Sequence, residues 1–172
     1  HACLADAEFF EYLEAHMEEI LALDQTACEH IAEKNCSIKY HVVMKDERET
    51  GLREVLNLGH TVGRAVETVS EYRLLHGEAV AIGLAAEVRL SQKTDAQAER
   101  VIALLKRAKL PTEIPLYIDR EKLVKKLYTD KKVRDGKLRF VVQNGIGEIV
   151  CFGENVYATP VSEETAREII MQ

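Results

Sequence analysis

The stretch at residues 47–83, ERETGLREVLNLGHTVGRAVETVSEYRLLHGEAVAIG, contains the patterns that decide how this chain folds. When residues 52–69 are placed on a helix at 100° per residue, their apolar side chains gather on one side. Such a stripe is typical of an amphipathic helix that packs on a core. The run that begins at residue 76 is apolar and rich in alanine, which predicts a second, largely buried helix. The stripe consists of Leu52, Val55, Leu58, Val62, Ala65, Val66 and Val69.

The opposite side of the first predicted helix is polar. Its residues Arg53, Asn57, His60 and Arg64 follow one another at i, i+4, i+7 and i+11 and therefore share a face. A polar stripe can face water without any further role, but solvated faces consist mostly of lysine and glutamate. Two guanidinium groups, an amide and an imidazole are instead suited to binding an anion. The residues alone leave both interpretations open.

Two histidines begin to define a candidate metal site. His76 opens the apolar run, where an imidazole is either a core side chain with a satisfied hydrogen bond or a ligand. His60 lies on the other predicted helix, within the anion-binding stripe. Zinc suits imidazole nitrogen, and a catalytic zinc has three protein ligands and one open position. The pair therefore indicates a metal site for which the sequence shows two ligands.

Three motifs, ERETGLREVLNLGHT, LHGEAVAIG and TDKKVRDGKLRFVVQNGIG, resemble in this order the C-terminal domain of the 3-dehydroquinate synthases. These enzymes are sugar-phosphate cyclases of the shikimate pathway, and the resemblance extends over essentially the whole chain. It implies a mainly α fold, that of the dehydroquinate synthase-like and iron-dependent alcohol dehydrogenase-like C-terminal domains. Residues 1–172 would form this single domain. Family members are about twice as long, and their N-terminal NAD-binding domain is absent from this chain.

The resemblance also assigns the metal ligands. In the family, the histidines of N-x-G-H-T and H-G-E-x-V-A coordinate zinc, or cobalt in its place, and they match His60 and His76. The third ligand is a glutamate of a G-x-A-E-x-x-K segment, which would lie upstream of His1. NAD would bind in the half that this chain lacks. We therefore expect the chain on its own to bind zinc weakly and to be inactive.

The resemblance further implies a substrate site. The side chains that match the family's substrate-binding residues are Lys39, Glu49, Arg53, Asn57 and the pair Lys131 and Lys132. One position departs from the pattern, because the family usually reads G-H-T-x-G-H-A and this chain has Arg64 at the second histidine. An arginine does not exchange protons near neutral pH, because its guanidinium group stays protonated there. It still binds phosphate through its planar fork.

The reaction implied is the conversion of 3-deoxy-D-arabino-heptulosonate 7-phosphate to 3-dehydroquinate and phosphate. The complete enzyme is expected to be a homodimer that acts on a small sugar phosphate. Three alternatives stay open. The first is a sister cyclase of the 2-deoxy-scyllo-inosose or epi-valiolone synthase type. The second is a metal-dependent polyol dehydrogenase, against which the cationic stripe argues, and the third is a non-catalytic helical module.

Composition narrows the classes of partner. The chain has 172 residues, enough for one domain with a sizeable core, of which 47% are hydrophobic and 30% charged. The net charge of −6 argues against a nucleic-acid surface, which needs a basic face. No apolar run approaches the roughly 18 residues of a membrane span. Four cysteines without a C-x-x-C pair, and no signal peptide in view, lead us to expect reduced thiols and a cytoplasmic location.

Further elements follow from helical spacing and capping residues. The sequence predicts helices at 1–23, 24–45, 119–128 and 162–172, and one that starts at Thr94 and Asp95 and ends before Pro111. Asp6, Thr50 and Ser162 are the expected N-caps. Two β-like runs at 138–143 and 148–152, separated by a glycine-containing turn, predict a small hairpin.

Overall fold

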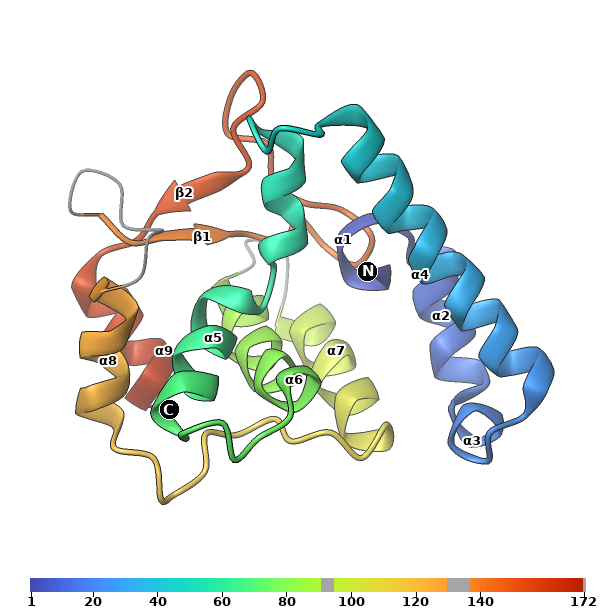
Figure 1. Ribbon diagram of the computed structural model, residues 1–172, viewed down its shortest axis with the longest axis horizontal. Helices are drawn as coiled ribbons and strands as arrows, with labels where there is room; N and C mark the ends of the chain where they lie inside the picture. The colour runs from blue at the N-terminus through green and yellow to red at the C-terminus, as the bar shows by residue number, and fades with distance from the viewer. Residues whose placement is uncertain (91–94, 130–136, 172) are drawn as a thin grey trace.

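The computed structural model describes residues 1–90, 95–129 and 137–171, and this part of the chain is mainly helical (Figure 1). The α-helices are α1 (Ala2–Ala5), α2 (Ala7–Ala15), α3 (Met17–Leu21), α4 (Gln25–Lys45), α5 (His60–Val69), α6 (His76–Glu87), α7 (Asp95–Arg107), α8 (Arg120–Thr129) and α9 (Glu163–Met171). Two 3₁₀ helices, η1 (Leu52–Asn57) and η2 (Val88–Leu90), and two strands, β1 (Arg139–Val141) and β2 (Ala158–Pro160), complete it. The expected mainly α architecture is confirmed. Within the described residues, no helix has both the length and the apolar character that a membrane crossing requires.

The N-terminal region differs in part from the expectation. The helical region predicted for residues 1–23 forms three helices, since α2 starts after Asp6, whose backbone is extended, and the chain breaks again at His16, which was not predicted. Asp6 is an N-cap as predicted, and its carboxylate accepts the backbone N–H of Phe9 at 2.8 Å. Asp24 caps α4 in the same way, and α4 is one continuous helix as expected.

The helix predicted over residues 52–69 is also wrong in one respect. It is interrupted at Leu58, which is extended, and at Gly59, whose φ of 76° lies in the left-handed region that glycine tolerates. The first segment, η1, is a 3₁₀ helix with three residues per turn, so the polar stripe does not continue along a single helix. Thr50 is not a cap either, because Gly51 occupies the N-cap position of η1 and the Asp46 carboxylate binds the neighbouring backbone.

The small sheet has a different partner from the one predicted. β1 pairs antiparallel with β2, with Phe140 opposite Thr159, instead of with residues 148–152. The predicted turn does form, since the N–H of Asn144 donates to the carbonyl of Glu148 at 2.8 Å. The two runs pair next to this turn, through the antiparallel bridge of Gln143 with Ile149 and the N–H of Val150, which donates to the carbonyl of Val142 at 2.8 Å. β1 itself pairs with a later segment of the chain. The hairpin predicted near 138–152 is therefore confirmed at its turn, whereas the two-stranded sheet is formed by residues 139–141 and 158–160.

Helix α6 lies between two hydrophobic clusters. Its residues Ala79 and Ile82 pack with apolar side chains of α5, α8 and α9. Its residues Ala85 and Val88, the latter just after its end, join a second cluster with α2, η1 and α7. The prediction of a largely buried helix at this place is confirmed.

The contact between α5 and α6 depends on glycine. A Cβ added at Gly83 would lie 2.0 Å from the carbonyl oxygen of Gly59 and 2.5 Å from the nitrogen of Gly63. Only a residue without a side chain allows the two backbones to approach this closely. Gly59 lies against Leu84 and Gly63 against Ala79, so the helices run antiparallel in a fixed register.

Candidate metal centre and its surroundings

The two predicted metal ligands lie side by side. His60 is the first residue of α5, and His76 is the first residue of α6. The centroids of their rings are 5.5 Å apart, with 54° between the ring planes. Because the two helices are locked together by the glycine contact, this juxtaposition is determined within the chain. The structure therefore brings together the pair that the sequence singled out, and their role as ligands stays a prediction.

Both imidazoles have a hydrogen-bond acceptor at Nδ1. For His60 it is the carbonyl oxygen of Leu58, at 3.1 Å. For His76 it is the carboxylate of Glu67, whose oxygens lie at 3.3 and 3.4 Å. A histidine that binds zinc through one nitrogen usually donates the other ring N–H to a carbonyl or a carboxylate. A proton on Nδ1 leaves Nε2 of each ring with the lone pair that a metal needs, so the residues present fit a divalent cation.

The histidines would supply two ligands and not a complete site. Within residues 1–90, 95–129 and 137–171, no group of three or more histidine, cysteine, aspartate or glutamate side chains is arranged to hold a metal. A catalytic zinc requires three protein ligands. A catalytic zinc bound by this pair would need a third ligand from outside the described residues, as the sequence motifs imply.

A buried carboxylate that sequence reasoning missed holds the turn before His60. Glu87, at the end of α6, is fully buried and accepts the backbone N–H groups of Gly59 at 2.7 Å and of Val62 at 2.8 Å. These are among the N–H groups that the start of α5 leaves without helical partners, and the helix dipole favours a negative charge there. A glutamate inside the apolar run from residue 79 was the available signal, since such a side chain is rarely buried without partners.

A second carboxylate fixes the backbone ahead of the metal centre. Asp46 is buried, and its oxygens accept the N–H groups of Thr50 and Gly51 at 2.8 Å and of Arg53 at 2.9 Å. These hydrogen bonds, above all the one from Arg53, lower the pKa of Asp46 to about 2. The Arg53 guanidinium donates in turn to the carbonyl of Glu47 at 3.0 Å. Arg53 therefore has a fixed backbone, and its side chain lies near residues 46–51, the connector between α4 and η1.

The other residues predicted to bind the substrate, where the structure describes them, have no contact with the two histidines comparable to the contact between the histidines themselves. Asn57, at the end of η1, is half-buried, whereas Arg64 is exposed one turn along α5 from His60. Lys39 is exposed on α4, and Glu49 is exposed in the connector with a φ of 55°. Among the described residues, no hydrogen bond or ion pair joins Lys39 or Glu49 to either histidine. The predicted pair Lys131 and Lys132 lies outside the described residues.

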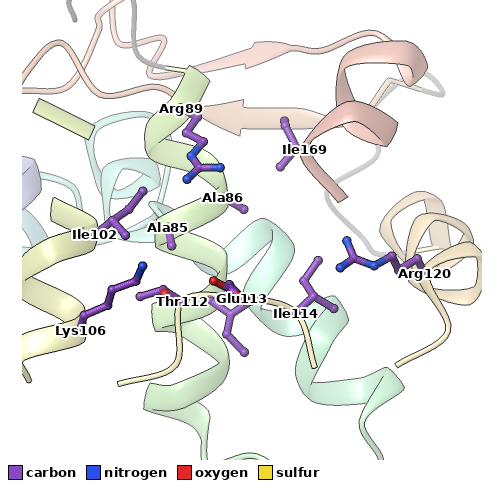
Figure 2. Close-up of a pocket in the computed structure, with 11 residues that line it drawn as sticks. Ala85, Ala86, Arg89, Ile102, Lys106, Thr112, Glu113, Ile114, Arg120 and Ile169 are labelled. Atoms are coloured by element: carbon purple, nitrogen blue, oxygen red, sulfur yellow. The ribbon is translucent and has the colours of Figure 1, made fainter. Parts of the chain in front are cut away.

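A hollow of about 170 Å³ lies on another face of α6 (Figure 2). Its wall includes Ala85 and Ile102, and four charged side chains surround it, namely Arg89, Lys106, Glu113 and Arg120. Arg120 also donates to the backbone carbonyl of Ile170. Neither histidine lines this hollow. It is therefore separate from the candidate metal centre.

Comparison with known proteins agrees with the sequence motifs. A family model described as 3-dehydroquinate synthase C-terminal matches residues 1–133. The chain belongs to this family. It is 38% identical over 152 residues to the 3-dehydroquinate synthase of Ruminiclostridium cellulolyticum, covering 87% of this chain and 42% of that protein. The enzyme of a Nostoc species is 41% identical over 174 residues, covering 97% of this chain and 46% of that protein. The chain thus spans less than half the length of these relatives.

Solved structures show the same fold. A 2-epi-5-epi-valiolone synthase from Streptomyces hygroscopicus, with NAD⁺ and Zn²⁺ bound, superposes with a TM-score of 0.81 at 24% identity, covering 99% of this chain and 47% of that chain. A 2-deoxy-scyllo-inosose synthase with carbaglucose-6-phosphate, NAD⁺ and Co²⁺ superposes with a TM-score of 0.69 at 22% identity, covering 78% of this chain and 39% of that chain. The predicted dehydroquinate synthase-like fold is confirmed.

Proposed function

We propose that this chain is the C-terminal half of a 3-dehydroquinate synthase that converts 3-deoxy-D-arabino-heptulosonate 7-phosphate to 3-dehydroquinate and phosphate. The observation that carries the proposal is the His60–His76 pair, in which each ring has an oxygen acceptor at Nδ1. Curated relatives with that name, 38% and 41% identical, support it. In the complete protein, residues 1–172 would be one domain, and an N-terminal domain would supply NAD and the third metal ligand.

His60 and His76 would hold the metal through Nε2, zinc or cobalt being the ions bound by similar folds. When bound, such a cation supplies Lewis acidity toward a substrate hydroxyl or ketone, and NAD supplies the hydride acceptor and donor. The protein's own task is then orientation. Glu87 contributes by fixing the turn that presents His60, through its two backbone hydrogen bonds.

Cationic side chains would bind the acidic substrate. Arg53, together with Asn57, would receive the carboxylate through its guanidinium fork. Arg64, one turn after His60, would receive the phosphate, together with Lys39 and the lysine pair at 131 and 132. Glu49 would complete this polar lining. Because Arg64 does not release its proton near neutral pH, protons in the elimination would move through the leaving phosphate or water.

The substitution Arg64→His tests this division of roles in the complete protein. Restoring an imidazole should weaken phosphate recognition, which raises KM, and should introduce a pH dependence of kcat near the pKa of histidine. The matched control is Arg73→His, which changes an exposed arginine in the loop after α5. If Arg64→His leaves KM, kcat and the pH profile all unchanged, the role given to Arg64 is wrong.

The sister-cyclase alternative shares this fold, as the TM-score of 0.81 to the valiolone synthase shows. Product analysis of the complete protein separates the candidates. With 3-deoxy-D-arabino-heptulosonate 7-phosphate we expect phosphate release and 3-dehydroquinate. With glucose 6-phosphate or sedoheptulose 7-phosphate we expect neither phosphate release nor a carbocycle. Turnover of either of these two sugars instead would identify a sister cyclase.

The chain by itself should be inactive. With two of three metal ligands it should bind zinc weakly, and nanomolar affinity by calorimetry would contradict this. We further propose that the complete protein is a homodimer, which light scattering after size exclusion tests.

A further inference from the structure

Glu67 is a carboxylate next to the candidate metal centre to which the family motifs assign no role. It lies on α5, seven residues after His60, so the two side chains share one face of the helix. Its two oxygens are nearly equidistant from Nδ1 of His76, at 3.3 and 3.4 Å. The Glu67 side chain is 20% exposed, whereas the His76 side chain is 59% exposed. The His76 ring is therefore oriented by this carboxylate more than by burial.

We propose that Glu67 is a positioning residue for His76. It accepts the Nδ1–H of the imidazole, selects that tautomer, and leaves Nε2 with the lone pair for the metal shared with His60. A neutral imidazole carries its proton on either nitrogen, and the hydrogen bond at one nitrogen decides which is free. The inference rests on the proposed function, because that function requires the metal.

The geometry distinguishes Glu67 from a third ligand. Its oxygens lie at the Nδ1 edge of the His76 ring, and Nε2 points away from that edge. The described residues, Glu67 among them, also hold no group of three side chains suited to one metal ion. A carboxylate at the Nδ1 edge orients the ring and leaves the coordination position to another residue.

The two histidines are supported by different kinds of acceptor. For His60 it is a backbone carbonyl within its own turn, which no substitution of a side chain removes. For His76 it is Glu67, on the neighbouring helix, and this contact depends on the register that the Gly63–Ala79 contact fixes. Helix α5 thus supplies one metal ligand and the acceptor that orients the other. This asymmetry makes the role of Glu67 testable by a single substitution.

The first test measures zinc affinity of the complete protein with a competing chelator at one neutral pH. In Glu67→Gln the affinity should fall about 10- to 100-fold, as for other carboxylates that orient metal-binding histidines. The matched control is Glu71→Gln, which removes the same charge at a position four residues after Glu67. The Glu71 side chain is 80% exposed and pairs with Arg73. Its affinity should stay within about twofold of the parent protein. Equal losses in the two variants would show a long-range charge effect and overturn the inference.

The second test reads the tautomer of His76 directly, by ¹⁵N-detected NMR of the metal-free protein. The parent protein should have its proton on Nδ1, and Glu67→Gln should shift the population toward protonation at Nε2. Unchanged tautomer populations, or unchanged zinc affinity, would overturn the role given to Glu67. An ordinary surface ion pair with a protonated His76 predicts a protonated ring and no tautomer preference.

Failure of the proposed metal site and failure of the role given to Glu67 can be distinguished. If zinc affinity is the same in the parent protein, His60→Ala and His76→Ala, the proposed metal site fails. The NMR measurement in the absence of metal still decides whether Glu67 orients His76. Thermal unfolding of Glu67→Gln should match that of the parent protein, which separates positioning from a loss of folding.

Discussion

The α5–α6 pair and the segment formed by α4 and the connector at 46–51 carry the candidate site in different ways. In the α5–α6 pair, glycines bring the backbones into contact, and a buried carboxylate fixes the turn before His60. Along α4, which lies at one edge of the molecule (Figure 1), Lys39 is exposed together with Tyr40 and Met44. Packing inside the chain therefore determines the geometry of the histidines. The cationic side chains remain open to solvent and would take their final positions against the substrate.

The largest effect is expected at Gly83, where the two helix backbones meet. In Gly83→Val the new side chain would collide with the carbonyl oxygen of Gly59, which belongs to the backbone and cannot move aside as a flexible side chain can. We expect a loss of about 3 kcal/mol or more in the free energy of unfolding, measured by urea titration. The control is Gly77→Ala in the same helix, where an added Cβ has no neighbour within 4 Å. That substitution should change the free energy of unfolding by no more than about 1 kcal/mol. Equal losses at both glycines would contradict the claim that the backbone contact at Gly83 holds α5 and α6 together.

The next largest effect is expected from Glu87→Gln. The glutamine side chain has one acceptor oxygen in place of two, and its NH₂ group would face a backbone N–H. One of the buried N–H groups of Gly59 and Val62 would therefore lose its acceptor. Unfolding free energy should fall by about 2 kcal/mol, and zinc affinity of the complete protein should fall with it because the turn before His60 loosens. Glu99→Gln, on the exposed surface of α7, is the control. Normal stability of Glu87→Gln would contradict the role of the buried carboxylate.

A smaller and pH-dependent effect is expected at Asp46, at the junction of the two regions. Hydrogen bonds from the backbone lower its folded-state pKa to about 2, below the ordinary value of an aspartate. The stabilisation from the ionised carboxylate is therefore complete above about pH 4 and is lost as pH falls toward 2.

In Asp46→Asn, the melting temperature should drop by about 3 °C or more at neutral pH. The difference from the parent protein should shrink as pH is lowered from 4 to 2, within the range where both still fold. A constant difference across this range would mean that the ionised form of Asp46 does not matter.

The smallest effect on folding is expected from Lys39→Met, on the exposed side of the comparison. Stability and zinc affinity should both stay close to those of the parent protein, with a change in unfolding free energy under about 0.5 kcal/mol. In the complete protein, the KM for the sugar phosphate should rise. The control is Lys125→Met on α8, an exposed lysine that was not assigned to the substrate site. A loss of stability comparable to that of Glu87→Gln would contradict the division into a packed and an open region.

The sequence predicted those elements whose signals are local. Asp24 and the apolar spacing after it are sufficient to predict α4, and the alanine-rich run predicts a buried helix at α6. The break at Gly59 was missed because Leu52, Val55 and Leu58 continue the apolar stripe. Their spacing of three residues is that of a 3₁₀ helix and was the available signal. The partner of β1 could not be predicted, because local alternation does not reveal which distant segment returns to pair with Phe140.

In the candidate site, too, features with a local sequence signal could be predicted and features set by tertiary contacts could not. His60 and His76 could be proposed from their motifs, whereas Glu67 and Glu87 required the register of two antiparallel helices. That register is set by the contact of Gly83 with Gly59 and Gly63, which no spacing within one helix reveals. The residues that position the candidate ligands are thus harder to predict than the candidate ligands themselves.

Zinc K-edge X-ray absorption of the complete protein tests the central claim most directly, namely that His60 and His76 bind one metal ion. We predict a first shell that contains two imidazole nitrogens at about 2.0–2.1 Å, and one fewer in each of His60→Ala and His76→Ala. A first shell without imidazole, or one that neither substitution alters, would contradict the account.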